Sequence, residues 1–426
     1  MVLMKLQSLV TLGRQPALGI AELESLYGGQ NVQPFGDAAL LALPANDIAF
    51  WRLGGSTRLC KLLTELPSPH WGDIKNYLLK STLEHAVYVP EGKLTIGLSV
   101  FGVKVVLKDV ERTLLEIKKR LRATGRPIRI VPNKQLELNT AQILHNKLTG
   151  PQGWELVVVS DGQTAYLAQT VQIQDIEAYA ARDQARPFRD AYVGMLPPKL
   201  AQIIINLAVG EDQPEVAETT NAVHLKNTVN TLSDVNPINA VNPILDPFCG
   251  TGVVLQEGTL MGFDVYGTDI EPRMVQYSID NLHWIREKST QNNANNVGEY
   301  VRIEQADATT HKWQQPIRAV AGETYLGKPL ASLPASDLLS KIIYEANLVN
   351  HKFLQNIAPQ LASGTRLCMA MPAWRGKHEF LHLPALDHLQ ELGYTRLKFT
   401  HASTSSLVYH REGQVVAREL VVLVKE

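Results

Sequence analysis

A glycine-containing turn between two apolar runs is the stretch of this chain whose residue types most directly predict chemistry. Ile244 and Leu245 end a predicted buried strand, and a predicted helix continues from Val253. Gly250 and Gly252 fall in the turn between them. Glycine at such a turn permits positive φ and lets a ligand approach the backbone near a helix N-terminus. We therefore expect this turn to hold a cofactor.

Acidic residues follow the predicted strands on either side of this turn. Asp246 follows the first strand, Asp269 ends the strand in "FDVYGTDIEP", and Asp307 ends the strand in "VRIEQADAT". Because the carboxyl ends of parallel strands meet at one edge of a sheet, the three acids are expected to line one crevice. Asp269 stands where an acid binds the hydroxyls of a ribose.

Two classes of cofactor fit such a crevice. A dinucleotide site normally has a third glycine, but Leu255 occupies that position, which weakens the case for NAD. The pattern Asp246-x-x-x-Gly250-x-Gly252 instead resembles the S-adenosylmethionine site of class I methyltransferases, and "DPFCGTG" resembles its variant in RNA and DNA amino-methyltransferases. The resemblance implies S-adenosylmethionine as cofactor. The predicted cofactor-binding residues are Asp246, Phe248, Gly250, Gly252, Asp269, Ile270, Asp307 and Ala308.

Composition narrows the class of protein. The 426 residues suggest two or three domains, and 45% hydrophobic with 19% charged residues is typical of a soluble globular protein. No apolar run reaches the roughly 18 residues of a membrane span, and the first residues do not form a signal peptide. We therefore expect a cytoplasmic protein without membrane contact. The three cysteines have neither the number nor the spacing of a disulfide framework or a zinc knuckle.

Positive charge is concentrated in one segment. Residues 101–150 contain 11 Lys and Arg against 4 Asp and Glu, although the whole chain has a net charge of −1. Such a segment can neutralise a phosphate backbone, or it can be a solvated helix face. The predicted RNA-binding residues are Lys118, Lys119, Arg120, Arg122, Arg126, Arg129 and Lys134.

Three longer stretches carry a resemblance that covers nearly the whole chain. These are "TLGRQPALGIAELESLYG", "ARPFRDAYVGMLPPKLAQIIINLA" and "GQVVARELVVLVK". Together with "DPFCGTG", they resemble the THUMP-containing tRNA guanosine-N2 methyltransferases. The resemblance implies a ferredoxin-like domain at 1–90, a THUMP RNA-binding domain at 91–175, a helical linker at 176–208 and a class I methyltransferase domain at 209–426. The expected fold is thus an α/β Rossmann-like domain preceded by two α+β domains.

The resemblance also implies the reaction. Relatives of this family transfer methyl from S-adenosylmethionine to a guanine exocyclic amine of tRNA, and some require a small activating subunit. They place Asp or Asn, Pro-Pro and an aromatic residue after the fourth strand, where the acid and a fixed carbonyl orient the amine and the ring stacks on the base. Here the sequence reads "IRAVAGETYLGKPL", without the two prolines. Glu323 and Tyr325 are the residues that could supply the acceptor and the ring.

Three alternatives stay open. The missing prolines are compatible with an RNA-binding pseudoenzyme, and the same chemistry could act on adenine instead. "HEFLHLPALDH" has the His378, Glu379, His382 spacing of a zinc peptidase. However, Pro384 is expected to start a separate helix over 385–394, and Ala385 replaces the glycine that would lead to His388 as a third ligand. Surface histidines without a metal are therefore the expectation.

Overall fold

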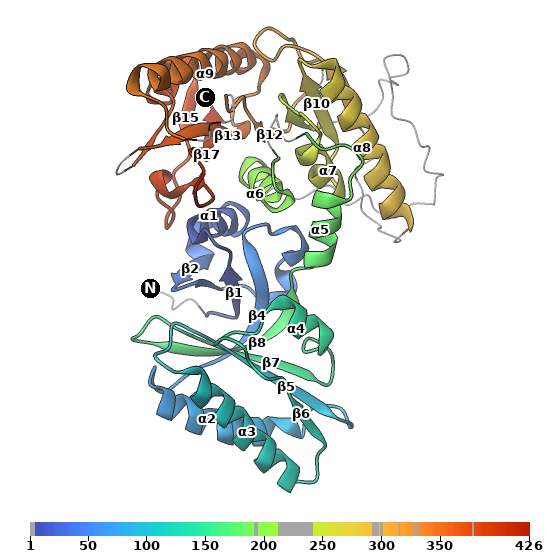
Figure 1. Ribbon diagram of the computed structural model, residues 1–426, viewed down its shortest axis with the longest axis vertical. Helices are drawn as coiled ribbons and strands as arrows, with labels where there is room; N and C mark the ends of the chain where they lie inside the picture. Colours follow the sequence, from blue (N-terminus) through green and yellow to red (C-terminus); the bar gives the residue numbers. More distant parts are fainter. Residues whose placement is uncertain are drawn as a thin grey trace. The chain divides into compact units, whose positions relative to one another are not determined.

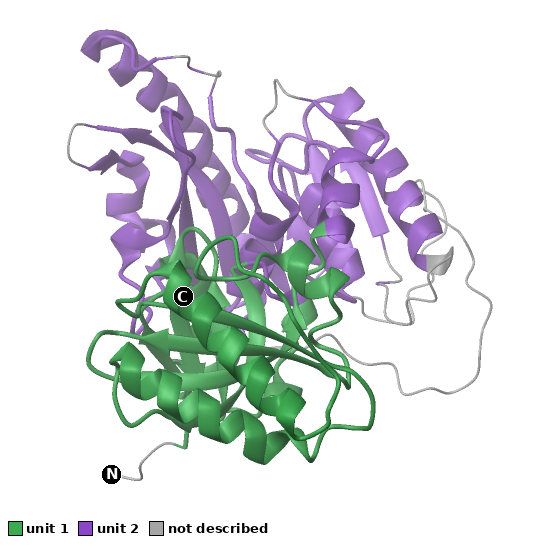
Figure 2. Ribbon diagram, turned by 60° about the horizontal axis from the view of Figure 1, so that its bottom comes forward, with its two compact units in different colours: residues 1–51, 55–176 green, residues 52–54, 177–426 purple. Residues whose placement is uncertain are grey.

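The computed structural model describes residues 5–190, 195–211, 242–291, 298, 301–314, 316–327, 330, 332–376 and 379–426. They form two compact units, drawn green and purple in Figure 2. Unit 1 comprises residues 1–51 and 55–176, and unit 2 comprises residues 52–54 and 177–426. Each unit is built around one β-sheet. The predicted domain boundaries at residues 90, 175 and 208 remain predictions.

Unit 1 contains an eight-stranded mixed sheet in the order β2-β3-β1-β4-β8-β7-β5-β6. β5 is parallel to both β6 and β7, and the other neighbouring strands are antiparallel. Its strands are β1 (Ser8–Leu12), β2 (Val32–Phe35), β3 (Ala38–Leu41), β4 (Ser56–Glu65), β5 (Leu94–Phe101), β6 (Ile128–Ile130), β7 (Gly153–Ser160) and β8 (Ala165–Ile173). Its helices are α1 (Pro16–Tyr27), α2 (Trp71–Ala86), α3 (Leu107–Ala123) and α4 (Thr140–His145).

The predicted basic helix is α3, and it is amphipathic. Val110, Leu114, Ile117 and Leu121 recur every three or four residues and are buried in a core shared with α2 and β5. Figure 1 shows α2 and α3 lying against the same part of the sheet. Since the apolar stripe faces the sheet, the basic residues between these positions are left for the opposite face of the helix.

Strand β7 contributes buried side chains to two hydrophobic cores, one on each face of the sheet. Leu156 and Val158 belong to the core beneath α2 and α3, whereas Val157 and Val159 belong to a second core. Successive side chains of a strand point to opposite faces, so the continuous apolar run "LVVV" serves both cores.

An ionisable side chain is buried within this sheet, on β7. Glu155 is fully buried, and it accepts hydrogen bonds of 2.6 Å from the hydroxyls of Ser99 and Thr170. Arg58 Nε lies 3.5 Å from its Oε1. Burial raises the pKa of Glu155, while Arg58 and the two hydroxyls lower it. Buried ionisable groups are tolerated when they are paired in this way.

Thr170→Val is expected to lower the free energy of unfolding by about 2 kcal/mol, because a hydrogen bond to a buried, charge-bearing group is lost without a change in side-chain shape. Chemical denaturation monitored by circular dichroism measures this difference. Thr95→Val in β5 of the same sheet is the matched control, since Thr95 makes no side-chain hydrogen bond within the described residues. An equal loss in both variants would contradict the assigned role of Thr170.

Unit 2 contains a sheet in the order β11-β10-β9-β12-β13-β17-β15. The five strands from β11 to β13 are parallel, and β17 lies antiparallel between β13 and β15. The chain order reverses between β9 and β12, which is the position where open α/β sheets bind ligands. The strands are β9 (Ile244–Asp246), β10 (Val265–Asp269), β11 (Val301–Gln305), β12 (Ala319–Glu323), β13 (Arg366–Arg375), β14 (Phe380–Leu381), β15 (Tyr394–Arg396), β16 (Val408–Tyr409) and β17 (Val416–Lys425).

Helices cover both faces of this sheet, as the predicted α/β fold requires. In β10, Val265 packs in a core with α7 and α8, whereas its neighbour Tyr266 packs in a core with α9. Figure 1 shows α7 and α8 beside β10, and α9 beside β13 and β17. The helices are α5 (Ile176–Gln184), α6 (Pro198–Val209), α7 (Val253–Leu260), α8 (Pro272–Gln291) and α9 (Ser336–Ile357). No helix among the described residues is long and apolar enough to cross a lipid bilayer.

The expectation of a helix over 385–394 is wrong in detail. The segment forms two short 3-10 helices, Pro384–His388 and Gln390–Leu392. The amide of Ala385 binds the side chain of Asn347, and the amides of Leu386, Leu392 and Gly393 bind carbonyls three residues earlier. Hydrogen bonds of this shorter span wind the chain more tightly than an α-helix does. Most of the predicted polar loop at 209–242 lies outside the described residues.

Candidate active site

The predicted glycine turn joins β9 to α7. Gly252 caps α7 in the left-handed region, with φ of 80°, and a Cβ there would lie 2.9 Å from Ser278 Oγ. Gly250 also has a positive φ of 52°. Side-chain-bearing residues rarely adopt this backbone conformation, so both positions favour glycine. The turn therefore brings bare backbone to the edge of the sheet, as the sequence predicted.

Asp269, the last residue of β10, links the glycine turn to that strand through hydrogen bonds. Its Oδ2 accepts a 2.9 Å hydrogen bond from the Gly250 amide, and its Oδ1 accepts one of 2.9 Å from the Glu271 amide. The Ser278 hydroxyl donates to the Gly250 carbonyl at 2.8 Å, which holds the other side of the turn. Burial raises the pKa of Asp269, although the backbone hydrogen bonds oppose this effect. A carboxylate has about four acceptor positions, so Asp269 can still bind ligand hydroxyls.

Asp246 ends β9 and is almost fully buried. Its Oδ1 accepts a hydrogen bond of 3.2 Å from the Phe248 amide. Burial raises the pKa of Asp246 well above its usual range, and the nearby charges of Asp269 and Glu323 add to the rise. Gly322 in β12 leaves room for this carboxyl, since a Cβ at that position would lie 2.5 Å from Asp246 Oδ1.

Asp307 lies in the loop after β11 and is held by local hydrogen bonds. Its Oδ1 accepts hydrogen bonds from the Thr309 amide at 2.9 Å and from the Thr309 hydroxyl at 2.7 Å. The Ala306 amide donates to the Asp269 carbonyl at 2.9 Å, and Asn356 of α9 donates to the Ala308 carbonyl at 3.0 Å. The loop is thus fixed to both neighbouring elements.

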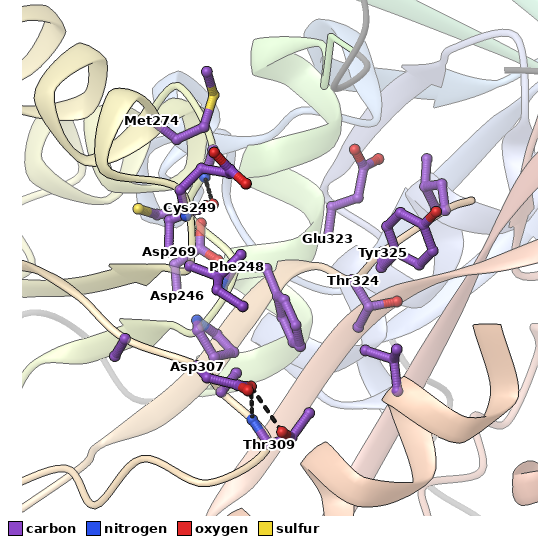
Figure 3. Close-up of a pocket in the computed structure, with 18 of the residues that line it drawn as sticks. Asp246, Phe248, Cys249, Asp269, Met274, Asp307, Thr309, Glu323, Thr324 and Tyr325 are labelled. Atoms are coloured by element: carbon purple, nitrogen blue, oxygen red, sulfur yellow. Dashed lines mark hydrogen bonds between the residues drawn. The ribbon is translucent and has the colours of Figure 1, made fainter. Parts of the chain in front are cut away.

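These elements surround a pocket of about 600 Å³, a volume typical of small-molecule sites. It opens where the strand order reverses, at the carboxyl ends of β9, β10 and β12. Figure 3 shows Asp246, Asp269 and Asp307 across the pocket from Glu323 and Tyr325. Seven predicted cofactor residues line it, namely Asp246, Phe248, Gly250, Asp269, Ile270, Asp307 and Ala308. Gly252 does not line the pocket; it shapes the turn behind it.

Glu323 and Tyr325, the predicted catalytic residues, also line the pocket. Glu323 ends β12 and forms a buried ion pair with Arg418 of β17. Burial raises the pKa of Glu323, and the Arg418 cation opposes the rise. The Thr324 amide donates to the Ala370 carbonyl at 3.0 Å, which extends the β12–β13 pairing by one residue. Tyr325 is 45% exposed, so a planar group can reach its side chain.

Several contributors to the pocket were not predicted from the sequence. Leu196 and Lys352 line it, although they lie far from the glycine turn in the chain. Arg418 was also missed as a partner of Glu323. An arginine inside the mainly apolar segment "VARELVVLV", in which Glu419 is the other charged residue, is the signal that could have indicated it, because a charge buried in a strand needs a partner.

The predicted RNA-binding residues do not share one environment. Lys119, Arg120, Arg122, Arg129 and Lys134 are exposed, and Lys118 is half-buried. Arg120 forms an ion pair of 2.7 Å with Glu116 on the same helix.

Arg126 is the exception among these basic residues. Its guanidinium donates to the carbonyls of Ala86, Val89 and Pro90, with the last two distances 3.2 and 2.6 Å. Arg126 therefore fixes the segment that follows α2. RNA contact by the remaining basic residues stays a prediction.

The zinc-peptidase motif gains no support from the described residues. His378 lies outside them. His382 Nε2 lies 3.2 Å from Asp387, and His388 Nδ1 lies 3.0 Å from Glu391, so the two histidines contact different carboxylates. In the part of the chain that the structure describes, no three His, Cys, Asp or Glu side chains are grouped to hold a metal ion.

Fold and pocket together define unit 2 as a methyltransferase domain, and comparisons with known proteins agree. Residues 224–386 match the family model of the RMKL-like methyltransferase domain. The match confirms the predicted S-adenosylmethionine-dependent methyltransferase. It also disfavours the zinc-peptidase alternative.

One sequence relative supports the predicted relationship to the tRNA guanosine-N2 methyltransferases, and one solved structure has a similar fold. The tRNA (guanine(10)-N2)-dimethyltransferase of Methanothermobacter thermautotrophicus is 29% identical over 192 residues, which are 45% of this chain and 42% of that protein. The match thus spans less than half of the relative's length. The crystal structure of TrmN from Thermus thermophilus has a TM-score of 0.50 and 17% identity, covering 99% of this chain and 100% of that one. This second likeness concerns the fold alone.

Proposed function

We propose that this methyltransferase transfers a methyl group from S-adenosylmethionine to the exocyclic N2 amine of a guanosine in tRNA. The observation that carries the proposal is the placement of an acceptor, Glu323, and an accessible ring, Tyr325, beside a nucleotide-type pocket. The name of the Methanothermobacter relative supports the same substrate. The exposed basic residues of unit 1 would bind the tRNA backbone.

The pocket residues fit S-adenosylmethionine chemically. Asp269 presents carboxylate oxygens suited to ribose hydroxyls, and Asp307 presents an acceptor suited to an adenine amine. The backbone of the turn at 247–251 has the close access that a methionine chain needs. When bound, the cofactor supplies an electrophilic methyl group on a sulfonium.

The work left to the protein is to orient the target amine, whose lone pair is delocalised into the base. A carboxylate oxygen of Glu323 accepts an amine hydrogen and so directs the lone pair toward the methyl group. Tyr325 stacks on the flipped base and keeps it in the plane that this hydrogen bond requires. Asp246 lines the same pocket across from these two residues, and burial raises its pKa.

Transfer of labelled methyl from S-adenosylmethionine to unmodified tRNA transcripts, followed by nucleoside analysis, tests this proposal. Labelled N2-methylguanosine is the expected product. Labelled N6-methyladenosine would instead identify an adenine amino-methyltransferase. Binding of cofactor and tRNA without transfer, with purified chain alone and with cell extract added, would indicate an RNA-binding pseudoenzyme.

Tyr325→Ala is expected to lower kcat/KM for tRNA by about ten- to a hundredfold, since stacking on one base contributes roughly 1–3 kcal/mol. Tyr325→Phe keeps the ring and is expected to retain most of the activity. Tyr344→Ala on α9 is the matched control, because Tyr344 is exposed but does not line the pocket. Full activity of Tyr325→Ala would remove the ring from the proposed site.

A further inference from the structure

The contact between Glu323 and Arg418 crosses an intervening strand. In the sheet register, Ala370 of β13 pairs with Glu323, and Pro372 of β13 pairs with Arg418. Residues paired across neighbouring strands share a face, and so do alternate residues of one strand. The guanidinium therefore reaches over β13 on the face that carries Ala370 and Pro372.

This contact occupies one oxygen of the carboxylate, and among the described residues the other oxygen accepts no hydrogen bond. Arg418 Nε donates to Glu323 Oε2, and the two side chains are only 8% and 13% exposed. No described residue donates a hydrogen bond to Glu323 Oε1. Because Glu323 lines the pocket, Oε1 is the atom available to a ligand there.

The backbone of the next residue, Thr324, is also fixed by a hydrogen bond. The Thr324 amide donates to the Ala370 carbonyl at 3.0 Å, and the Thr324 side chain is buried. In the resembled family, two prolines stiffen this position. In this chain, the ion pair with Arg418 and the hydrogen bond between Thr324 and Ala370 fix Glu323 instead.

The charge of Arg418 also acts on the protonation of Glu323. Burial favours the neutral carboxylic acid, Asp246 of β9 adds negative charge nearby, and Arg418 favours the carboxylate. The ionised form is the stronger acceptor for an amine hydrogen. Loss of Arg418 would therefore free the Glu323 side chain to change rotamer and would also promote protonation of its carboxylate.

We infer that Arg418 is a positioning residue, which holds the Glu323 carboxylate so that Oε1 faces the pocket as the acceptor for the target amine. The inference rests on the proposed transfer to an exocyclic amine. Arg418 does not itself contact the substrate in this arrangement. It acts through Glu323.

Steady-state methyl transfer to tRNA transcripts across a range of pH tests this role. Arg418→Met is expected to lower kcat at least about tenfold near neutral pH, since a misplaced acceptor costs rate rather than affinity. The acid limb of the pH profile of kcat is expected to move to higher pH in Arg418→Met, while KM for S-adenosylmethionine changes by less than about twofold. Arg418→Lys keeps the positive charge and is expected to recover part of the rate.

A double-variant comparison separates positioning from general damage. In a Glu323→Gln background, Arg418→Met is expected to change kcat by less than about twofold, because the group it acts on is gone. The double variant also leaves no unpaired buried carboxylate, so it stays foldable if Arg418→Met does not. Arg375→Met is the matched control, as Arg375 is exposed at the end of β13 and does not line the pocket.

The outcomes distinguish the inference from the function on which it rests. An active wild type with an unshifted pH profile in Arg418→Met would overturn the role of Arg418 alone. So would an equal loss of kcat in both backgrounds. A wild type that methylates no tRNA would overturn the proposed function, and the positioning role with it.

Discussion

Replacement of Asp269 by alanine is expected to weaken S-adenosylmethionine binding by more than about a hundredfold. Each hydrogen bond from a ribose hydroxyl to a carboxylate contributes roughly 1.5–3 kcal/mol, and a ribose offers two. The variant also loses the acceptor for the Gly250 and Glu271 amides, so the glycine turn is no longer tied to β10. Isothermal titration calorimetry with the purified protein measures the loss.

Asp264→Ala is the matched control for this variant. Asp264 immediately precedes β10, whereas Asp269 ends the strand, and only Asp269 lines the pocket. The control is expected to bind S-adenosylmethionine with wild-type affinity. Comparable losses in the two variants would show that damage to β10, rather than a missing ribose contact, explains the result.

The pH dependence of binding follows from the environment of Asp269. Burial raises its pKa, so the carboxyl takes up a proton at a higher pH than it does in the unfolded chain. The unliganded protein is therefore stabilised, with respect to this group, as the pH falls through the raised pKa. Cofactor binding is expected to weaken as the pH falls, because the ionised carboxylate of Asp269 is the form that accepts the ribose hydrogens. Affinity measured at decreasing pH is expected to fall as the folded protein's Asp269 becomes protonated.

The sequence predicted the cofactor side of the pocket because that information is local. A strand, a glycine turn and a helix occupy consecutive residues. An acidic residue stands at the end of each predicted strand and can be read directly from the sequence. Parallel pairing then brings Asp246, Asp269 and Asp307 to one edge, whatever lies elsewhere in the chain. Gly252 is the exception, since its left-handed conformation shapes the turn without exposing it to the pocket.

The contacts that the sequence did not predict join residues far apart in the chain. Arg418 and Glu323 are separated by 95 positions, and the antiparallel insertion of β17 beside β13 brings them together. Arg58 and Glu155 meet because β4 and β7 flank β8 in the other sheet. Neither the periodicity nor the spacing of these residues specifies strand neighbours. Only the folded sheet does so.

Glu323→Gln is expected to lower kcat about a hundredfold, and Glu323→Ala by up to about a thousandfold. Removing one group that stabilises a transition state through a fixed hydrogen bond typically has effects of this size. Glutamine keeps a neutral acceptor of similar shape, which explains the smaller loss, whereas alanine has none. S-adenosylmethionine affinity is expected to change little, because Glu323 stands across the pocket from the predicted ribose contact. Single-turnover methyl transfer measures the chemical step directly.

The pH dependence of kcat in these variants tests the role of Glu323 more specifically than the loss of kcat does. Burial raises the pKa of Glu323 even though Arg418 opposes it, so wild-type kcat should fall as the pH decreases through that raised value. Glutamine does not titrate, and the acid limb should therefore disappear from the Glu323→Gln profile while the remaining rate stays flat. Glu345→Gln, an exposed substitution on α9, is the matched control and should keep the wild-type profile. An acid limb that persists in Glu323→Gln would assign the titration, and the acceptor role, to another carboxyl group such as Asp246.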